Sequence, residues 1–342
     1  MESKECNEQE KKSIHTIEEV ASSLGISKTT VSRAISGKGR VSEQTRNKVL
    51  NYMEAHNFKP RKHLEKWTDK RTYNICVTLP GEQKFAEMEY FQKILMSIYD
   101  FFTIHGYNIV IAKIEPNNMQ VLKQLVLRHK IDGVILTRSM EKDDAILYLQ
   151  EKKVPFVVVG SYADKQVVQV DVNHEEACQE LTSILIRMGM KKFAVLCGDI
   201  KQNATKNRLL GCRYAFENNR ISLESDNIYK DVVEPIMTDK VINDLKRKNI
   251  ECILCLDDNI CINVLNKLRR DDIKIPEDIK VASFYNSSLL DEHYPSITCT
   301  EFDINGLGIM ASKLLLGLLN EEVVPSKMMM GYKVILKEST KI

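Results

Sequence analysis

The sequence predicts an all-helical N-terminal head followed by an α/β body with parallel sheets arranged in two lobes. In the head, up to Met53, apolar residues recur at helical spacing. From Tyr73 onward, runs rich in Val, Ile and Leu alternate with amphipathic stretches instead. The length of 342 residues also exceeds what one small domain needs, so two or more hydrophobic cores are expected.

Three short helices are expected in the head. Thr16 to Glu19 has the form of a capping box, in which a hydroxyl N-cap precedes a carboxylate by three residues. The first helix stops at Gly25, a residue that tolerates a positive φ. The second helix begins at Ser27 with the letters SKTTVSRAIS. The third begins near Val41 and Ser42, and its apolar residues are Val49, Leu50 and Met53.

The spacing of Ala21, Gly25 and Val31 is typical of a DNA-reading helix-turn-helix. Two helices that cross steeply need a small residue at the crossing, a glycine in the turn and an aliphatic residue at the corner. The outward face of the second helix carries donors and no carboxylate, namely Lys28, Thr29, Thr30, Ser32, Arg33 and Ser36. These side chains suit base edges and phosphates. The alternative is a three-helix bundle without a ligand.

The charge distribution separates the head from the rest of the chain. Between Ile14 and Arg71 there are 12 Lys and Arg residues against 6 Asp and Glu residues, although the whole chain has a net charge of only +2. A basic segment on a mildly acidic body fits a module that binds a polyanion. A solvated charged face is the alternative.

The body is expected to alternate strands with helices. The expected strands are YNICVTL, YNIVIAKI, IDGVILT, PFVVVGS, VVQVDV, KKFAVLCG, ECILCLDD and IKVASFYN, with a last one from Tyr332 to Leu336. The expected helices include 90–105, 175–188, 259–271 and 306–319. Ligands of such folds bind where the carboxyl ends of the strands meet across a cleft.

Several classes of function find no support. There is no run of about 18 apolar residues, no secretory signal, and residues 1–13 are expected to form a disordered arm. The nine cysteines are scattered as in a reduced compartment. Cys252 and Cys255 form a C-x-x-C inside a strand, which aims them at opposite faces and favours core packing over a metal site. We find no catalytic constellation or P-loop, so neither enzymatic activity nor a cofactor is expected.

The segment TIEEVASSLGISKTTVSRAISGKGRVSEQTRNKVLNYMEAHNFKP resembles the DNA-binding head of the lactose-repressor/purine-repressor (LacI/GalR) family of bacterial transcriptional regulators. The resemblance includes the T-V-S-R of the second helix and the V-S-x-x-T-R that opens the third. It implies base contacts in the major groove for Lys28, Thr29, Arg33 and Arg40. It implies phosphate contacts for Thr16, Ser27, Ser32, Thr45 and Arg46.

In that family the following linker folds on DNA and wedges a leucine into the minor groove. Here the linker is residues 60–72, and it departs from the family because Trp67 occupies the wedge position and Leu64 replaces a small residue. Apolar wedges of this kind unstack a base step and kink the duplex. The alternative is that Trp67 packs the linker against the body.

The body resembles the family's type I periplasmic-binding-protein-like sensor, with landmarks such as HGYNIVI, IDGVIL, IPEDIKVASFYN and ITCTEFDINGLG. The resemblance implies effector contacts for Tyr90, Phe91, Arg208, Asp257, Tyr285 and Phe302. Tyr285 replaces a usual aspartate, Phe302 a frequent glutamine, and Asp257-Asp258 a usual Asn-Asp. The family implies a sugar or sugar-like metabolite, whereas the aromatic replacements favour a nucleoside-like ligand.

Together these features predict a cytoplasmic, nucleoid-associated homodimer that represses transcription from a near-palindromic double-stranded DNA operator under control of a small-molecule effector. The alternative keeps DNA binding but has a protein partner, or a nucleoside-like ligand, as its signal. The expected domains are a head of residues 14–59, a hinge of 60–72, and an effector-binding and dimerisation domain of 73–342. Within it, the N-lobe comprises 73–171 and 304–330, and the C-lobe 172–303 and 331–342.

Overall fold

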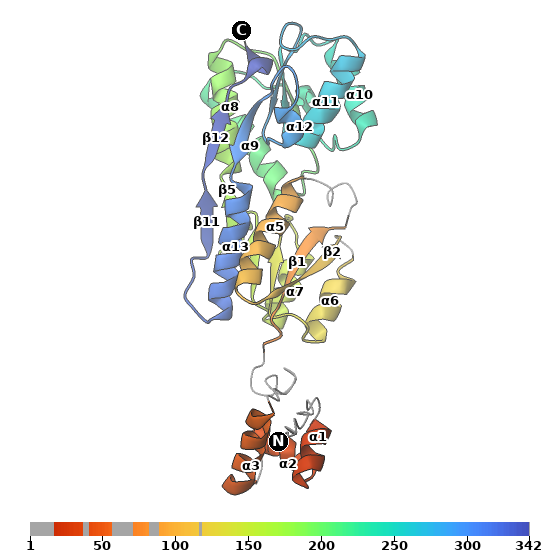
Figure 1. The fold of residues 1–342 in the computed structure, drawn as a ribbon. Coiled ribbons are helices and arrows are strands. Elements are labelled where there is room, and N and C mark those ends of the chain that lie inside the picture. The colour runs from red at the N-terminus through yellow and green to blue at the C-terminus, as the bar shows by residue number, and fades with distance from the viewer. Residues whose placement is uncertain (1–16, 37–40, 57–70, 82–88, 116–117, 342) are drawn as a thin grey trace, which may run out of the picture. The chain divides into compact units, whose positions relative to one another are not determined.

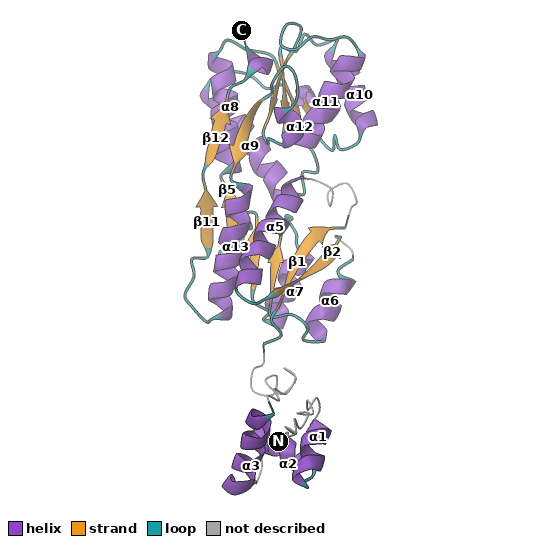
Figure 2. Cartoon of the chain, in the orientation of Figure 1, coloured by secondary structure: helices purple, strands orange, loops and turns teal. Residues whose placement is uncertain are grey.

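The computed structural model describes residues 17–36, 41–56, 71–81, 89–115 and 118–341 (Figure 1). The chain divides after Arg71 into two compact units. In the described part of the first unit all regular structure is helical, whereas the second unit combines strands and helices (Figure 2).

The first unit consists of α1 (Ile17–Leu24), α2 (Lys28–Ser36) and α3 (Glu43–Ala55). Their apolar faces meet in one small core, whose fully or nearly fully buried members are Val20, Ala21, Val31, Ala34, Val49 and Met53. Ala21 and Val31, two of the residues that define the expected helix-turn-helix, lie in this core. Their spacing in the sequence therefore lets them pack where the helices cross.

The first lobe of the second unit is built on a six-stranded sheet in the order β11-β5-β4-β3-β1-β2. All its pairs are parallel. Its strands are β1 (Asn74–Pro80), β2 (Asn108–Ile114), β3 (Gly133–Leu136), β4 (Phe156–Val159), β5 (Gln169–Val172) and β11 (Lys327–Met330). One face is covered by α5 (Glu89–Ile104) and α13 (Ile304–Leu319). The other is covered by α6 (Gln120–Leu127) and α7 (Asp144–Lys152).

The second lobe contains a six-stranded sheet in the order β12-β10-β9-β8-β6-β7, in which only β12 is antiparallel to its neighbour. Its strands are β6 (Phe193–Leu196), β7 (Ile228–Tyr229), β8 (Cys252–Cys255), β9 (Lys280–Ser283), β10 (Thr298–Phe302) and β12 (Tyr332–Ile335). Helices α8 (His174–Arg187) and α9 (Asn203–Asn218) cover one face. Helices α10 (Pro235–Leu245) and α11 (Asp258–Arg270) cover the other, and the short α12 (Ser288–Asp291) follows β9.

The chain passes between the two sheets from β5 to α8, from β10 to α13 and from β11 to β12 (Figure 1). Strands buried on both faces need near-continuous apolar sequence, which the body supplies. The predicted fold class, a helix-turn-helix head and a two-lobed α/β body with parallel sheets, is therefore confirmed. No helix in the described ranges has both the length and the apolar character needed to cross a membrane.

The two cysteines of the C-x-x-C motif lie on opposite faces of the second sheet. Cys252 packs with the residues of α8 and α9, and Cys255 packs with those of α10 and α11. Both are fully buried. The alternation of side chains along a strand therefore separates the two thiols, as the sequence predicts.

Candidate functional site

The second helix of the head presents its predicted reading residues outward. Val31 and Ala34 are buried beneath α2, while Lys28, Thr29 and Arg33 are exposed. Since α2 is fixed from below by the small core, its outer face has a defined orientation relative to α1 and α3. A rigid helix with exposed donors at these positions is what a major groove can accommodate.

The turn between α1 and α2 is closed by backbone hydrogen bonds. Ile26 N donates to Ala21 O at 3.0 Å and Gly25 N donates to Ser22 O at 3.3 Å, the two bonds of a Schellman motif. Gly25 has a φ of +65°, a backbone conformation that side-chain-bearing residues rarely adopt. The turn therefore needs glycine for its backbone conformation and not for lack of room, because a Cβ there would meet nothing within 4 Å.

Ser27 caps α2, and Ser42 caps α3 in the same way. Ser27 Oγ accepts from Thr30 N at 3.1 Å and lies 2.8 Å from Thr30 Oγ1. Ser42 Oγ accepts from Thr45 N at 3.2 Å and lies 2.7 Å from Thr45 Oγ1. Within each pair one hydroxyl donates to the other, so the proton of the second hydroxyl can donate to a ligand. A phosphate at either helix N-terminus would find a donor and a favourable dipole.

Lys28 is not free in this structure, because its ammonium forms an ion pair with Glu18 of α1. The hydrogen bond from Lys28 lowers the pKa of the Glu18 carboxyl. The reading face of α2 carries no carboxylate of its own, but α1 supplies one. No sequence pattern predicts this contact, which Lys28 must exchange before it can reach a base edge.

The remaining predicted DNA contacts fall into two groups. Ser32, Thr45 and Arg46 are partly buried, and the Nε atom of Arg46 is buried without a hydrogen-bond partner. Thr16, Arg40, Leu64 and Trp67 lie outside the described residues. The contacts assigned to all of these side chains, and to Lys28, Thr29, Arg33 and Ser27, stay predictions.

In the body, a cavity of about 100 Å³ lies between the two lobes. It is lined from both sheets at the carboxyl ends of the strands, by Tyr90, Phe91, Thr137, Arg138, Ser139, Val159, Gly160, Asp171, His174, Gln202, Ala204, Thr205, Arg208, Asp257, Asp258 and Tyr285. Five of the six residues predicted to contact an effector are among these; the sixth, Phe302, is not. The enclosed volume is small compared with the roughly 300–1,000 Å³ of usual ligand pockets.

Arg208 lines this cavity and is nine-tenths buried. Its Nε donates to His174 Nδ1 at 3.2 Å, and its Nη1 donates to Leu256 O at 2.7 Å. Burial and the nearby Arg208 charge hold the pKa of His174 well below its usual range, so the ring is neutral. Because Nδ1 accepts, the ring proton sits on Nε2, which faces Asp171 Oδ1 at 3.6 Å.

Asp171 ties this group to the first lobe. Its Oδ2 accepts from Ser161 Oγ at 2.8 Å and its Oδ1 accepts from Val172 N at 2.8 Å. Burial raises the pKa of the Asp171 carboxyl despite these bonds. Asp171 is the last but one residue of β5 and His174 begins α8, so this polar cluster spans one of the connections between the lobes.

Two adjacent carboxyls stand at the start of α11. Asp257 is the N-cap, and its Oδ1 accepts from Ile260 N at 2.8 Å. Asp258 is buried, and its Oδ1 has no hydrogen-bond partner. Burial and the neighbouring Asp257 raise the pKa of Asp258 to about 6, and burial raises that of Asp257.

Aromatic rings form a connected group beside these carboxyls. Tyr90 contacts Phe91 and Tyr285 edge to face, with ring centroids 5.0 and 5.8 Å apart. Tyr285 is also stacked on Phe302 at 6.5 Å. Phe302 packs edge to face on the His174 ring at 5.3 Å, so it supports the site from behind. The aromatic replacements noted in the sequence therefore do cluster in space.

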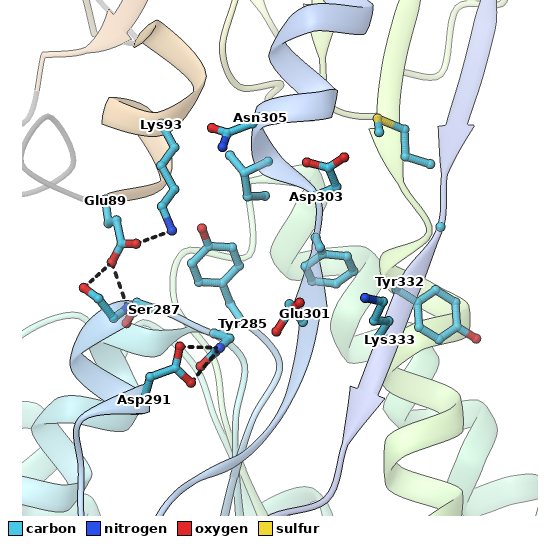
Figure 3. A pocket seen from close by; sticks show the side chains of 16 residues that line it. Glu89, Lys93, Tyr285, Ser287, Asp291, Glu301, Asp303, Asn305, Tyr332 and Lys333 are labelled. Atoms are coloured by element: carbon cyan, nitrogen blue, oxygen red, sulfur yellow. Dashed lines mark hydrogen bonds and ion pairs between the residues drawn. The ribbon is translucent and has the colours of Figure 1, made fainter. Parts of the chain in front are cut away.

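A larger cavity of about 740 Å³ lies beside the crossing strands, between α5, α12, β10 and β12 (Figure 3). Several of its charged side chains are already bonded to protein. Glu89 pairs with Lys93 and accepts from Ser288 N and Ser288 Oγ, and Asp291 accepts from Asn286. We assign the ligand site to the smaller cavity, because the strand ends and the unpartnered carboxylate oxygen converge there.

The two lobes contact each other directly at the cleft. Asn203 Nδ2 of α9 donates to Ser139 Oγ at 3.2 Å, Met140 O at 3.2 Å and Ser161 O at 2.9 Å. Nearby, Glu141 N donates to Lys201 O at 2.9 Å. The bonds between Glu89 and Ser288 also join α5 of the first lobe to α12 of the second. These bonds join the two lobes across the cleft.

No sequence-based prediction covers Asn203, Asp171 or His174, and of the Asp257-Asp258 pair only Asp257 is among the predicted effector contacts. Asp171 lies next to the end of β5 and Asp258 follows β8, so their place at a strand's carboxyl end is an available signal. His174 starts a helix directly after such a strand. No sequence pattern marks Asn203, whose partners come from loops about 40 to 65 residues away.

Comparison with known proteins agrees with this architecture. Residues 16–61 match the family described as bacterial regulatory proteins, lacI family, and residues 182–340 match a periplasmic binding protein-like domain. Catabolite control protein A of Staphylococcus epidermidis is 24% identical over 313 residues, covering 90% of this chain and 94% of that protein.

Two solved structures cover 95% of this chain. The transcriptional regulator CelR–cellobiose complex has a TM-score of 0.71 at 22% identity over 100% of its chain. The lac repressor dimer bound to operator and the anti-inducer ONPF has a TM-score of 0.72 at 19% identity over 99% of its chain. The chain therefore joins a helix-turn-helix head of the lacI family of bacterial regulatory proteins to a periplasmic-binding-protein-like domain.

Proposed function

We propose that this protein is a transcriptional repressor that binds a near-palindromic operator as a homodimer, and that a small molecule bound between its lobes sets its affinity for DNA. The observation that carries the proposal is the exposed, carboxylate-free face of α2, fixed by a packed core, in one chain with a closable two-lobed cleft. The lac repressor homologue bound to operator as a dimer and the CelR complex with cellobiose support a DNA partner and a sugar or related effector.

The head would supply both recognition and general affinity. Arg33, Lys28 and Thr29 would contact base edges in the major groove. The hydroxyls that cap α2 and α3 would donate to phosphates at the helix N-termini. Arg40, Leu64, Trp67 and Thr16 would add contacts from residues outside the described ranges. Two such heads on one dimer would read the two halves of the operator.

The body would supply regulation without catalysis. A ligand that prefers one arrangement of the lobes shifts the equilibrium by its difference in affinity for the two states, and such couplings are usually about 1–3 kcal/mol. Asn203 and Glu89 hold the closed arrangement, while Arg208, Asp257 and Tyr285 would contact the ligand. A regulator of this kind would act in the cytoplasm, where operator DNA is found.

The test is selection of duplexes from a random pool by the full-length protein, followed by competition between the selected and random sequences. We expect a near-palindromic sequence that binds at least about a thousandfold more tightly than random duplex. The affinity for random duplex should fall steeply with salt because it depends on phosphate contacts. Failure to enrich any sequence, with equal affinity for selected and random duplex, would refute the proposed function.

A further inference from the structure

The acidic end of the interlobe cavity lacks a partner. Among the described residues that line this cavity, Asp258 alone has a buried side-chain polar atom, Oδ1, without a hydrogen bond. Its side chain is 7% exposed. The neighbouring Ser287 hydroxyl is also buried without a hydrogen-bond partner of ordinary length, and as a nearby donor it lowers the pKa of the Asp258 carboxyl. One hydroxyl leaves a buried carboxylate short of donors, so it marks a place where a ligand donor would be stabilised.

The negative charge around Asp258 is only partly offset, because burial and Asp257 raise its pKa while the Arg208 charge lowers it. Asp257 is its direct neighbour, and in the described part of the chain no Lys or Arg nitrogen forms an ion pair with either carboxyl. Arg208 lines the same cavity, but its guanidinium donates to His174 and to the Leu256 carbonyl. A neutral hydroxyl would supply the missing hydrogen bond and leave this charge uncompensated. A cationic donor would supply both the hydrogen bond and a compensating positive charge. Charge-assisted hydrogen bonds are also about twice as strong as neutral ones.

Aromatic rings complete the environment of a cation. Tyr285 lines the same cavity and packs edge to face on Tyr90. Burial raises the pKa of the Tyr285 hydroxyl, and the charge of Asp258, which lines the same cavity, raises it further. Aromatic faces attract ammonium groups, most strongly in a desolvated site.

We propose that the effector carries a protonated amine, which binds the Asp258 carboxylate beside the Tyr285 ring. The proposal rests on the proposed function, because it names the class of molecule that the interlobe site takes. The cavity of about 100 Å³ favours a ligand of monosaccharide size or smaller over a disaccharide or a nucleotide. Asp258 is then the residue that discriminates an amine from the corresponding alcohol.

Matched sugars that differ in one group test the proposal on the full-length protein. Glucosamine, galactosamine and mannosamine are compared with glucose, galactose and mannose by calorimetry at pH 6.8, where the amines are largely protonated. We expect at least one amine to bind about tenfold or more tightly than its neutral parent, in line with a charge-assisted bond. In the variant Asp258→Asn this preference should fall to about twofold or less, since the amide keeps the shape and loses the charge.

Asp278→Asn is the matched control, because it removes an exposed carboxylate from the same lobe outside the cavity. It should keep the amine preference, which separates a local bond from the overall charge. The proposal is overturned if none of the amines binds, if every neutral parent binds as well as its amine, or if Asp258→Asn keeps the preference.

Operator affinity of the same samples distinguishes failure of this inference from failure of the proposed function. If the protein binds a selected operator but shows no amine preference, only the proposed ligand class is refuted. A protein that binds amines through Asp258 but no operator keeps the ligand site and loses the regulatory role.

Discussion

Arg208 shows how a single buried side chain organises the ligand site. Its guanidinium connects the start of α8, through His174, with the residue that follows β8, through the Leu256 carbonyl. The family resemblance placed an arginine here as an effector contact. The structure adds that its bonds to protein fix the tautomer of His174 and thereby the orientation of that ring toward Asp171.

Removing this side chain should destabilise the body. In Arg208→Met, the His174 ring nitrogen and the Leu256 carbonyl lose their donor inside the protein, at a cost on the order of 1–3 kcal/mol. Urea unfolding followed by circular dichroism measures the change. Arg213→Met is the control, since Arg213 is exposed on the same helix and should change stability by less than about 0.5 kcal/mol. Equal effects of the two variants would show that the buried bonds contribute nothing.

The raised pKa of Asp258 predicts a pH-dependent penalty on stability. Its pKa of about 6 in the folded chain exceeds the ordinary value of 3.8, so the folded state binds this proton more tightly than the unfolded state. Stability is then full below about pH 4 and declines as the pH rises to about 6 and above. Asp258→Asn should therefore be more stable than the parent protein at pH 7.5, by on the order of 1–3 kcal/mol.

Measuring the free energy of unfolding of the parent protein and of Asp258→Asn at several pH values separates the effect of this carboxyl from that of the other acids. The difference in the free energy of unfolding should shrink toward zero as the pH falls to 4. A difference that stays constant from pH 4 to 7.5 would mean that Asp258 is not the titrating group.

At the scale of elements, the turn between α1 and α2 and the contact between α9 and the first lobe each depend on one residue. Gly25 permits the left-handed turn that sets the crossing of the reading helix. Asn203 reaches three oxygens of the opposite lobe from the first turn of α9. The first could be predicted from sequence because a glycine between helical patterns has one physical meaning. The second could not, because it depends on how distant loops come together.

Gly25→Ala should weaken the head without disturbing its core. The Cβ meets no atom within 4 Å, so the cost comes from the left-handed backbone alone and should be about 1 kcal/mol. Hydrogen exchange of the backbone amides of α1 and α2 in the full-length protein measures it as faster opening. Gly25→Asn should recover part of the loss, since asparagine tolerates this conformation better than alanine. An alanine variant that exchanges like the parent protein would contradict this role.

Asn203→Asp should open the cleft between the lobes. A carboxylate cannot donate to Ser139 Oγ, Met140 O and Ser161 O, and its charge would lie against their negative dipoles. We expect a larger radius of gyration in small-angle scattering and faster amide exchange around Ser139. Lys206→Met, which breaks the exposed pair between Lys206 and Glu141 nearby, should leave both unchanged because such pairs contribute little. Unchanged scattering in Asn203→Asp would rule out this contact as the clamp.

At the scale of the whole molecule, the sequence predicted the division into head and body, the parallel sheets and most strands of the core, since continuous apolar runs and helical periodicity are local signals. Five of the six residues that the sequence predicts as effector contacts line the interlobe cavity. The sequence did not predict the closure of the cleft, the ion pair between Glu18 and Lys28, or the unpartnered oxygen of Asp258. Each of these depends on the distance between segments that periodicity leaves unspecified.

The same limit applies to short or polar elements. The two-residue strand β7 and the methionine-rich β11 are too short to show alternation, and each is recognised only by its neighbour in a sheet. α9 begins with polar residues because its first turn faces the other lobe rather than the core. The first turn of α9, which carries contacts between the lobes, therefore does not have the apolar pattern of an ordinary core helix.

Arg33→Lys in the full-length protein tests the central claim most directly. The substitution keeps the charge but removes the planar fork that can bind two atoms of one base edge. We predict that the ratio of affinity for the selected operator to that for random duplex falls about ten- to a hundredfold, with little change for random duplex. Lys48→Ala, which removes an exposed cation from α3, should leave that ratio unchanged. An Arg33→Lys protein that keeps the parent's ratio would contradict the claim that α2 reads the operator.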